Sequence, residues 1–238
     1  MNPPQPRANL DALLAILQRA LGHEVPNHLI AVQGMARLLE LEESERLGPD
    51  GRDYLQRLSA AAQRAHGQVR ALADFIRALR SQAPAAPVSL PDVVREAATE
   101  VNQLFSGCSI EYHFPEHGPY LRMPGTALRQ VVVSLLRNAR GAALPEQILR
   151  VEIGARETPT AVELWVADNG RGLSPEQQQK LLDPSHFLDV HGEGLGLVLA
   201  RQLAETWDGR LVVESSEKHG SRFSIIWPVP AGEARNKL

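Results

Sequence analysis

Cysteine, long apolar runs and excess charge are all scarce in this sequence, and each shortage excludes a class of protein. Cys108 is the single cysteine among 238 residues, so the chain forms no internal disulfide and no cysteine-cluster metal site. No apolar run reaches the roughly 18 residues that a membrane-spanning helix requires. The start, residues 1–7, is proline-rich and polar and is therefore no signal peptide. The net charge of −3 gives no reason to expect nucleic acid or a membrane as a partner, so we expect a cytoplasmic protein.

The first third of the chain has the periodicity of two helices. Apolar residues recur at helical spacing from Leu10 to Leu39, and a second stripe runs from Leu55 to Leu79 with alternating spacings of three and four. Residues 48–51, Gly-Pro-Asp-Gly, predict the turn between them. One hairpin leaves a long apolar stripe uncovered, so we expect a homodimer that forms a four-helix bundle. The alternative is a monomeric hairpin that packs on a second domain.

His23 is predicted to face away from the apolar stripe of the first helix. It lies two residues from both Leu21 and Val25, roughly 200° around the helix from each. Pro26 follows closely and removes one backbone hydrogen bond, which kinks a helix. A lone exposed histidine is usually only solvated, so the rest of the chain has to decide whether His23 carries chemistry.

The remaining two thirds predict a mixed domain after a linker at residues 81–87. The two domains are expected at residues 7–82 and 88–230. Ser89 and Pro91 are typical of a helix start, and grouped rather than alternating elements predict an α+β sandwich. The expected helices cover residues 89–105, 126–142, 175–182 and 192–207. The expected strands cover residues 109–114, 151–155, 161–167, 211–215 and 221–227, and a loop is expected at 183–191.

Three features of the second domain are suited to binding a nucleotide. Asn138 is a polar amide on a strongly apolar helix, and its oxygen is a suitable Mg²⁺ ligand. Asp168 ends a strand before Gly170 and Gly172, where a carboxylate can accept a hydrogen bond from an adenine amino group. A glycine-rich run precedes a helix, whose free amides can hold phosphates; its glycines are Gly192, Gly194 and Gly196.

In order along the chain, these segments resemble the sequence boxes of sensor histidine kinases. Asn138-Ala139, residues 168–173 (Asp-Asn-Gly-Arg-Gly-Leu), residues 192–197 (Gly-Glu-Gly-Leu-Gly-Leu) and residues 220–223 (Gly-Ser-Arg-Phe) resemble the N, G1, G2 and G3 boxes. Residues 21–29 resemble the H box that carries the phosphoacceptor histidine. The resemblance covers about residues 7–230. It implies a dimerising helical hairpin followed by a catalytic domain of the Bergerat or GHKL fold, which DNA gyrase and a heat-shock chaperone share.

The resemblance also implies a role for each matching residue. His23 would accept the γ-phosphoryl group of ATP, Glu24 would act as general base, and Asn27 would orient water when a response regulator is dephosphorylated. Asn138 would hold Mg²⁺ and Asp168 would recognise adenine. The other residues expected to line the nucleotide are Gly170, Gly172, Gly192, Gly194, Leu195, Gly196 and Ser221. For Asn27, a purely structural role beside Pro26 is the alternative.

The sequence departs from the family pattern at three places. Pro26 and His28 stand where the family usually has a basic residue and the H-box proline, and Ser134 replaces the first of two asparagines in the N box. The loop at residues 184–189 lacks the usual lysine and ends on Asp189, whose charge would repel phosphates. We therefore expect kinase activity that is slow or that depends on a partner.

No sensory segment is evident in the sequence. We expect either a cytoplasmic kinase that takes its signal from a separate sensory partner, or the core of a longer kinase. The predicted function is an ATP-dependent histidine kinase that passes its phosphoryl group to the receiver domain of a response regulator, with a phosphatase activity as a further possibility. The alternative is a histidine phosphotransferase or adaptor whose ATP-binding domain is vestigial.

Overall fold

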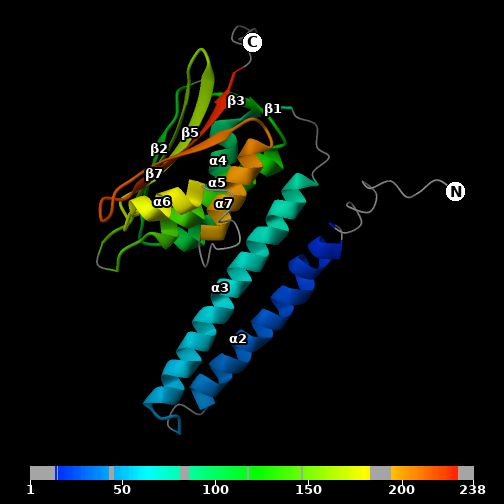
Figure 1. The fold of residues 1–238 in the computed structure, drawn as a ribbon, viewed down its shortest axis with the longest axis vertical. Helices are drawn as coiled ribbons and strands as arrows, with labels where there is room; N and C mark the ends of the chain where they lie inside the picture. The colour runs from blue at the N-terminus through cyan, green and yellow to red at the C-terminus, as the bar shows by residue number, and fades with distance from the viewer. Residues whose placement is uncertain are drawn as a thin grey trace, which may run out of the picture. The chain divides into compact units, whose positions relative to one another are not determined.

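The computed structural model describes residues 14, 16–42, 46–80, 86–116, 118–145, 147–182 and 194–229. The chain divides into two compact units, Met1–Arg77 and Ala78–Leu238, which Figure 1 shows as a pair of long helices and a mixed α/β body. Each unit is described below by itself. None of the helices in these described ranges is both long enough and apolar enough to cross a membrane.

The N-terminal unit consists of helices, as its periodicity predicts. A π-helical turn, η1 (Ala20–Glu24), leads into α2 (Val25–Glu42), and α3 (Pro49–Leu79) follows. The prediction of a turn over residues 48–51 was wrong from Pro49 onward. Proline lacks the N–H that the first helical turn leaves unbonded, so Pro49 can open α3, and Asp50 adds a favourable negative charge in its first turn.

Large apolar side chains remain exposed on both long helices of this unit. Exposed apolar residues of this kind often mark a surface that another protein covers. They are not confined to one position, since they recur along α2 and at the start of α3. Apart from Leu79 in the last turn of α3, the exposed large apolar residues of these two helices are Ile30, Val32, Met35, Leu38, Leu39, Leu41, Tyr54 and Leu58.

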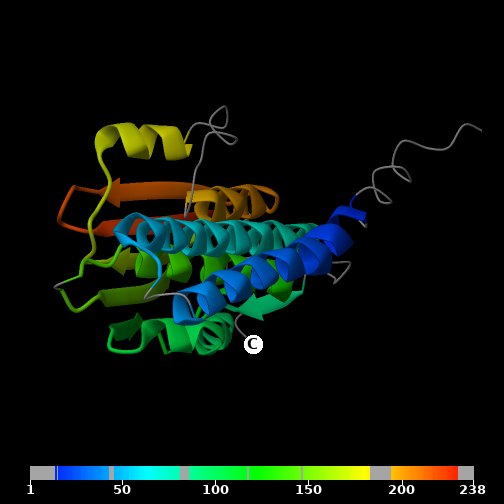
Figure 2. The same cartoon turned by 90° about the horizontal axis from the view of Figure 1, so that it is seen from below.

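The second unit contains a five-stranded sheet with helices on one face. The strands are β2 (Ser109–His113), β4 (Arg150–Glu157), β5 (Ala161–Asp168), β6 (Arg210–Ser215) and β7 (Ser221–Pro228). Their order is β2-β4-β5-β7-β6, and only the β2–β4 pair is parallel. Figures 1 and 2 show α4 (Leu90–Val101), α5 (Gly125–Gly141) and α7 (Gly194–Glu205) together on one side of this sheet. The predicted α+β class is confirmed for this unit.

The core of this unit lies between the sheet and these helices. Strand β5 alternates as the pleat requires, with Val162, Leu164 and Val166 fully buried. Leu128 and Leu135 of α5 are also completely inaccessible. Helix α5 packs against both α4 and α7, so it lies centrally in the helical layer. Burial of this size fixes the register of β5 and therefore the position of Asp168 at its end.

Two short strands were missed by the sequence prediction. Strand β1 (Pro87–Ser89) pairs antiparallel with β3 (Tyr120–Arg122), and Pro87 therefore belongs to a strand rather than to the predicted linker. Three-residue strands are too short to show a period of two. Ser89 is confirmed as the N-cap of α4, because its hydroxyl accepts a hydrogen bond from the Asp92 N–H. The predicted end of this helix also differs, since residues Asn102–Phe105 form a 3-10 turn, η2.

Candidate functional site

Asp168 is a buried carboxylate with one oxygen left unpaired. It ends β5 and is 8% exposed. Its Oδ1 accepts a hydrogen bond from the Gly170 N–H at 2.9 Å, and the Ser221 N–H also donates to the carboxylate. Its Oδ2 is buried and has no partner among the described residues. A buried acceptor without a donor is costly, so this oxygen is suited to a ligand that brings an N–H or O–H.

Burial raises the pKa of the Asp168 carboxyl above its usual range. The two backbone N–H groups and the positive charge of Arg171 act in the opposite direction but do not cancel the effect of burial. An acid whose pKa is shifted by burial at a hollow surface is a candidate functional group. A hollow of about 440 Å³ is indeed lined by Asp168, together with Ser215, Gly220 and Ser221.

Two glycines near Asp168 lie so close to neighbouring backbone that a Cβ at either position would collide with it. A Cβ on Gly170 would lie 2.3 Å from the carbonyl oxygen of Ala142, and one on Gly172 would lie 2.0 Å from that of Ser216. Gly172 also has φ +68°, a conformation that other residues adopt only with strain. These contacts show that the G1 segment is wedged between the end of α5 and the end of β6.

Hydrogen bonds fasten this segment to α5, the helix that carries Asn138. The Arg171 N–H donates to the carbonyl of Ala142, and its guanidinium donates to the carbonyl of Gly141, both at 2.8 Å. Asn169 bridges to β4 by accepting a hydrogen bond from the Arg150 N–H at 2.7 Å. Asn138 itself is half-buried near the end of α5. Asp168 and Asn138 therefore belong to one rigidly connected part of the unit.

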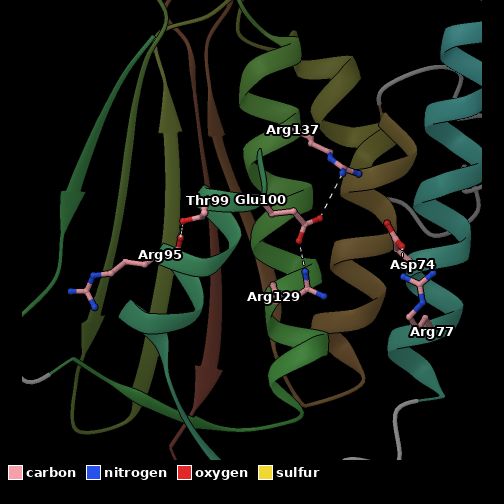
Figure 3. A network of polar contacts seen from close by, with 7 residues as sticks. All are labelled: Asp74, Arg77, Arg95, Thr99, Glu100, Arg129 and Arg137. Carbon is pink, nitrogen blue, oxygen red and sulfur yellow. Dashed lines mark hydrogen bonds and ion pairs between the residues drawn. The ribbon is translucent and has the colours of Figure 1, made fainter. Parts of the chain in front are cut away.

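Ion pairs between α4 and α5 hold the same helix against α4. Figure 3 shows Glu100 of α4 between two arginines of α5, Arg129 and Arg137. The Arg137 Nη2 lies 3.9 Å from a Glu100 oxygen, and Arg129 is hydrogen-bonded to the other oxygen. Arg137 directly precedes Asn138, so this network anchors the helix at the turn that presents the amide.

Helix α7 packs against α5, the helix that carries Asn138. Gly194 is its first residue, and Leu195 and Gly196 are half-buried in its first turn. No described atom lies within 4 Å of a Cβ placed on Gly196. Space at a helix N-terminus is compatible with an anionic ligand. Gly192 and the predicted loop at residues 183–191 lie outside the described residues.

His23 lies in the first unit, within the π-helical turn that precedes α2. In this turn the Val25 N–H donates to the carbonyl of Ala20, five residues earlier. Pro26 follows immediately and has no N–H to continue the ladder, so the irregular turn lies at the position where the sequence predicts a weakened helix. His23 is exposed, which confirms the predicted outward orientation.

The neighbours of His23 are also exposed. Glu24 is close to Arg19, with the carboxylate Oε1 3.5 Å from the guanidinium Nε. Asn27 lies in the first turn of α2 and His28 follows it, both open to solvent. The structure thus leaves the ring of His23 and the candidate base accessible. The nucleotide candidates Asp168, Asn138 and Ser221 are all in the other unit.

Three residues of the site were missed by sequence reasoning: Arg171, Gln178 and Ser215. The Arg171 contacts are described above. Ser215 bonds to both turns beside Asp168, and Gln178 of α6 (Pro175–Leu182) donates to two backbone carbonyls there. Arg171 lies within the G1 segment, but the motif assigns it no contact, and Gln178 and Ser215 belong to no motif. Their partners are 5 to 42 residues away in the chain, so only the fold reveals these contacts.

Comparisons with known proteins first define the class of the second unit. Residues 124–231 match the family described as histidine kinase-, DNA gyrase B-, and HSP90-like ATPases. The chain also shares the fold of a mycobacterial sensor histidine kinase, MprB, with a TM-score of 0.52 over 60% of this chain and 96% of that one, at 23% identity. The unit is therefore a GHKL-type domain.

Relatives also match along almost the whole chain. The chain is 27% identical over 218 residues to the sensor histidine kinase ZraS of Salmonella typhi, covering 90% of this chain and 46% of ZraS. It is 25% identical over 217 residues to sporulation kinase C of Bacillus subtilis, covering 90% and 48%. The structure of full-length ShkA in complex with AMPPNP matches with a TM-score of 0.58 and 25% identity, over 91% of this chain and 45% of ShkA. The chain is thus similar to sensor histidine kinases along almost its whole length, and it spans about half the length of these curated relatives.

Proposed function

We propose that this chain is an ATP-dependent protein histidine kinase that phosphorylates His23 and passes the phosphoryl group to the receiver domain of a response regulator. The observation that carries the proposal is the buried, unpaired Oδ2 of Asp168 at the glycine-framed end of the sheet. That oxygen suits the exocyclic amino group of adenine, which is a donor of the right kind. The relatives named sensor histidine kinases, and the ShkA complex with an ATP analogue, support the same conclusion.

The proposed reaction transfers the γ-phosphoryl group of ATP to a ring nitrogen of His23. The bond between the γ-phosphorus and the β–γ bridging oxygen breaks, a phosphorus–nitrogen bond forms, and ADP leaves. Glu24, adjacent to His23 and exposed, takes the imidazole proton as general base. Because the transferred group has little covalent chemistry to undergo, positioning and electrostatics supply most of the catalysis.

Asn138 is the proposed contact to Mg²⁺ on the nucleotide. Its half-buried amide oxygen, near the end of an otherwise apolar helix, fits the oxygen ligands that this ion prefers. Mg²⁺ would neutralise charge on the phosphates. Asn138 would help to orient the phosphates, and the free N–H groups at the start of α7, around Gly194 and Gly196, would bind them.

A second copy of the chain and a receiver domain are the proposed protein partners, with a separate sensory protein as a third. The exposed apolar residues of α2 and α3 support the homodimer. Asn27, exposed and four residues after His23, supports a phosphatase role in which its amide orients water toward a phosphorylated receiver.

The test is incubation of the pure protein with γ-labelled ATP and Mg²⁺, followed by a search for an acid-labile, alkali-stable label. We expect label on the wild type and none on His23→Gln. The control is His28→Gln, a change of the same kind at another exposed histidine of the neighbouring helix, which should keep the label. Equal labelling of both variants would refute His23 as the acceptor.

Asn27→Ala separates the two activities in the same assay. We expect autophosphorylation to persist and dephosphorylation of a receiver to fall. Loss of both activities together with a lower melting temperature would make Asn27 structural. A wild-type protein that binds ATP but is never labelled would favour the phosphotransferase or adaptor.

A further inference from the structure

Ser215, the last residue of β6, connects two turns that flank Asp168. It is half-buried and lies opposite Ser221 in the β6–β7 ladder. Ser221 is in turn the cross-strand partner of Asp168 on β5. Ser215 is therefore two strands away from the carboxylate, at the same end of the sheet.

The hydroxyl of Ser215 uses its full hydrogen-bonding capacity. Its Oγ accepts from the Leu173 N–H at 2.8 Å and lies 3.0 Å from the Gly220 carbonyl, to which it donates. The Ser221 Oγ is 2.9 Å away. Because the single Ser215 proton is used on Gly220, Ser221 is the donor in that contact. One donor and two acceptors are all that a serine hydroxyl offers.

The groups that Ser215 holds are those that hold Asp168. Leu173 directly follows Gly172, in the turn whose Gly170 N–H donates to the Asp168 Oδ1. Gly220 lies against the Asp168 backbone, since a Cβ there would be 1.9 Å from its carbonyl oxygen. The Ser221 N–H donates to the Asp168 carboxylate itself. A single hydroxyl thus connects both donors of the carboxylate.

Gln178 of α6 also forms hydrogen bonds to Leu173 and Ser215. Its Nε2 donates to the carbonyl of Leu173 at 3.1 Å and to that of Ser215 at 3.0 Å. Leu173 is consequently fixed through its N–H by Ser215 and through its carbonyl by Gln178. Helix α6 also packs against β6, so this amide fixes its start to the strand end.

We propose that Ser215, supported by Gln178, is a positioning residue for base recognition by Asp168. It makes no contact with the base. It fixes the two turns so that the Asp168 Oδ2 is kept unpaired and aimed at the ligand, and it keeps the neighbouring N–H groups from relaxing onto that oxygen. This inference rests on the proposed function, because it assumes that Asp168 recognises the amino group of adenine.

The experiment compares ADP with inosine diphosphate, which carries a carbonyl oxygen where adenine has its amino group. Dissociation constants of both are measured by calorimetry for the wild type, Ser215→Thr and Ser215→Val. Threonine and valine have nearly the same shape and both suit a strand, so the pair differs in the hydroxyl alone. We expect Ser215→Thr to keep the wild-type preference for ADP and Ser215→Val to reduce that preference about tenfold, since a misaligned hydrogen bond loses most of its discrimination.

Ser224→Ala is the matched control. Ser224 is another buried serine of the same sheet, on β7, and its hydroxyl bonds to Glu163 away from the Asp168 turns. This variant should melt at a lower temperature and keep the full ADP preference. A purely structural role of Ser215 would give the same result as Ser224→Ala.

Equal ADP preference in the folded Ser215→Thr and Ser215→Val variants would overturn the inference. If the valine variant fails to fold, Gln178→Ala decides, because Gln178 is only half-buried and holds the same residue, Leu173. A reduced ADP preference in Gln178→Ala supports the inference, and an unchanged preference overturns it. A wild-type protein that binds ADP no better than inosine diphosphate would instead refute the proposed role of Asp168.

Discussion

At the residue scale, the main feature is that the fold buries the carboxylate of Asp168 at a cost in stability. An aspartate in this position loses hydration, and only its Oδ1 is compensated by the Gly170 N–H. A protein selected only for stability would bond or remove the second oxygen. The cost is therefore consistent with a site that gains its missing hydrogen bond on binding.

Asp168→Asn should stabilise the free protein at neutral pH. Burial raises the pKa of the carboxyl in the folded state above its unfolded value, so ionisation disfavours the fold as the pH rises through the folded pKa. A neutral amide does not carry this penalty. We expect a higher melting temperature than wild type at pH 7, and no such advantage at a pH well below the unfolded pKa of about 3.9, where the carboxyl is protonated in both states.

The same variant should bind ADP about tenfold more weakly, because an ionised acceptor is replaced by an amide that presents a donor. Asp53→Asn, at an exposed residue paired only with Arg57 among the described contacts, is the control and should change neither property measurably. A lower melting temperature at pH 7, or an unchanged affinity, would contradict this account.

At the element scale, the π-helical turn at Ala20–Glu24 follows from a single residue. Pro26 cannot donate to the carbonyl of Gly22, and its ring would crowd that carbonyl in a regular helix. The ladder adapts by a bond from Val25 to Ala20, one residue longer than usual. His23 therefore lies on a locally irregular helix, which is common at functional positions.

Replacing two glycines of the second unit by alanine should change the free energy of unfolding in opposite directions. Gly172→Ala places a Cβ into the Ser216 carbonyl at a positive φ, so we expect the free energy of unfolding to fall by more than about 1 kcal/mol. Gly196→Ala fills open space in the first turn of α7 and should raise it by up to about 1 kcal/mol. Denaturant titration measures both changes.

The affinity for ADP tests the proposed role of Gly196 separately from its effect on stability. If Gly196 approaches the phosphates, its alanine variant should be more stable and yet bind ADP several-fold more weakly, by the same logic that places glycine where a ligand nears the backbone. Normal ADP affinity in a stabilised Gly196→Ala protein would remove Gly196 from the proposed site without affecting Asp168.

At the scale of the whole molecule, we predict dimerisation through the first unit. Leu58 of α3 is 46% exposed, so in a monomer its replacement by glutamate would be close to neutral. In a dimer the same change buries a charge in an apolar interface and should yield monomers. Light scattering at micromolar concentration measures the mass.

Leu104→Glu provides a control of matched exposure. Leu104 is likewise 46% exposed but lies in η2 of the second unit, outside the predicted bundle. It should remain a dimer. A monomeric wild type at micromolar concentration would exclude the bundle and leave the monomeric hairpin.

Much of the local structure could be predicted from the sequence, because helices and strands bury one face and repeat with a fixed period. Helix α5 and strands β5 and β7 were expected within two residues of their observed bounds. The six-residue G1 segment and the glycines at the start of α7 were predicted as nucleotide contacts from residue type and order, and they stay predictions. Strands β1 and β3 and the π-helical turn were missed, because three to five residues carry too little pattern.

The sequence by itself determined where the apolar faces lie, which residues are candidates for phosphate and base contacts, and that His23 points to solvent. Each of these depends on residues close together in the chain. Only the tertiary structure decided that β2 pairs parallel with β4, that Asp168 keeps one oxygen unpaired, and that Ser215 bonds to Leu173, 42 residues away. Hydrogen bonds between distant segments depend on how whole layers pack, and one residue of shift in register would exchange every partner at the site.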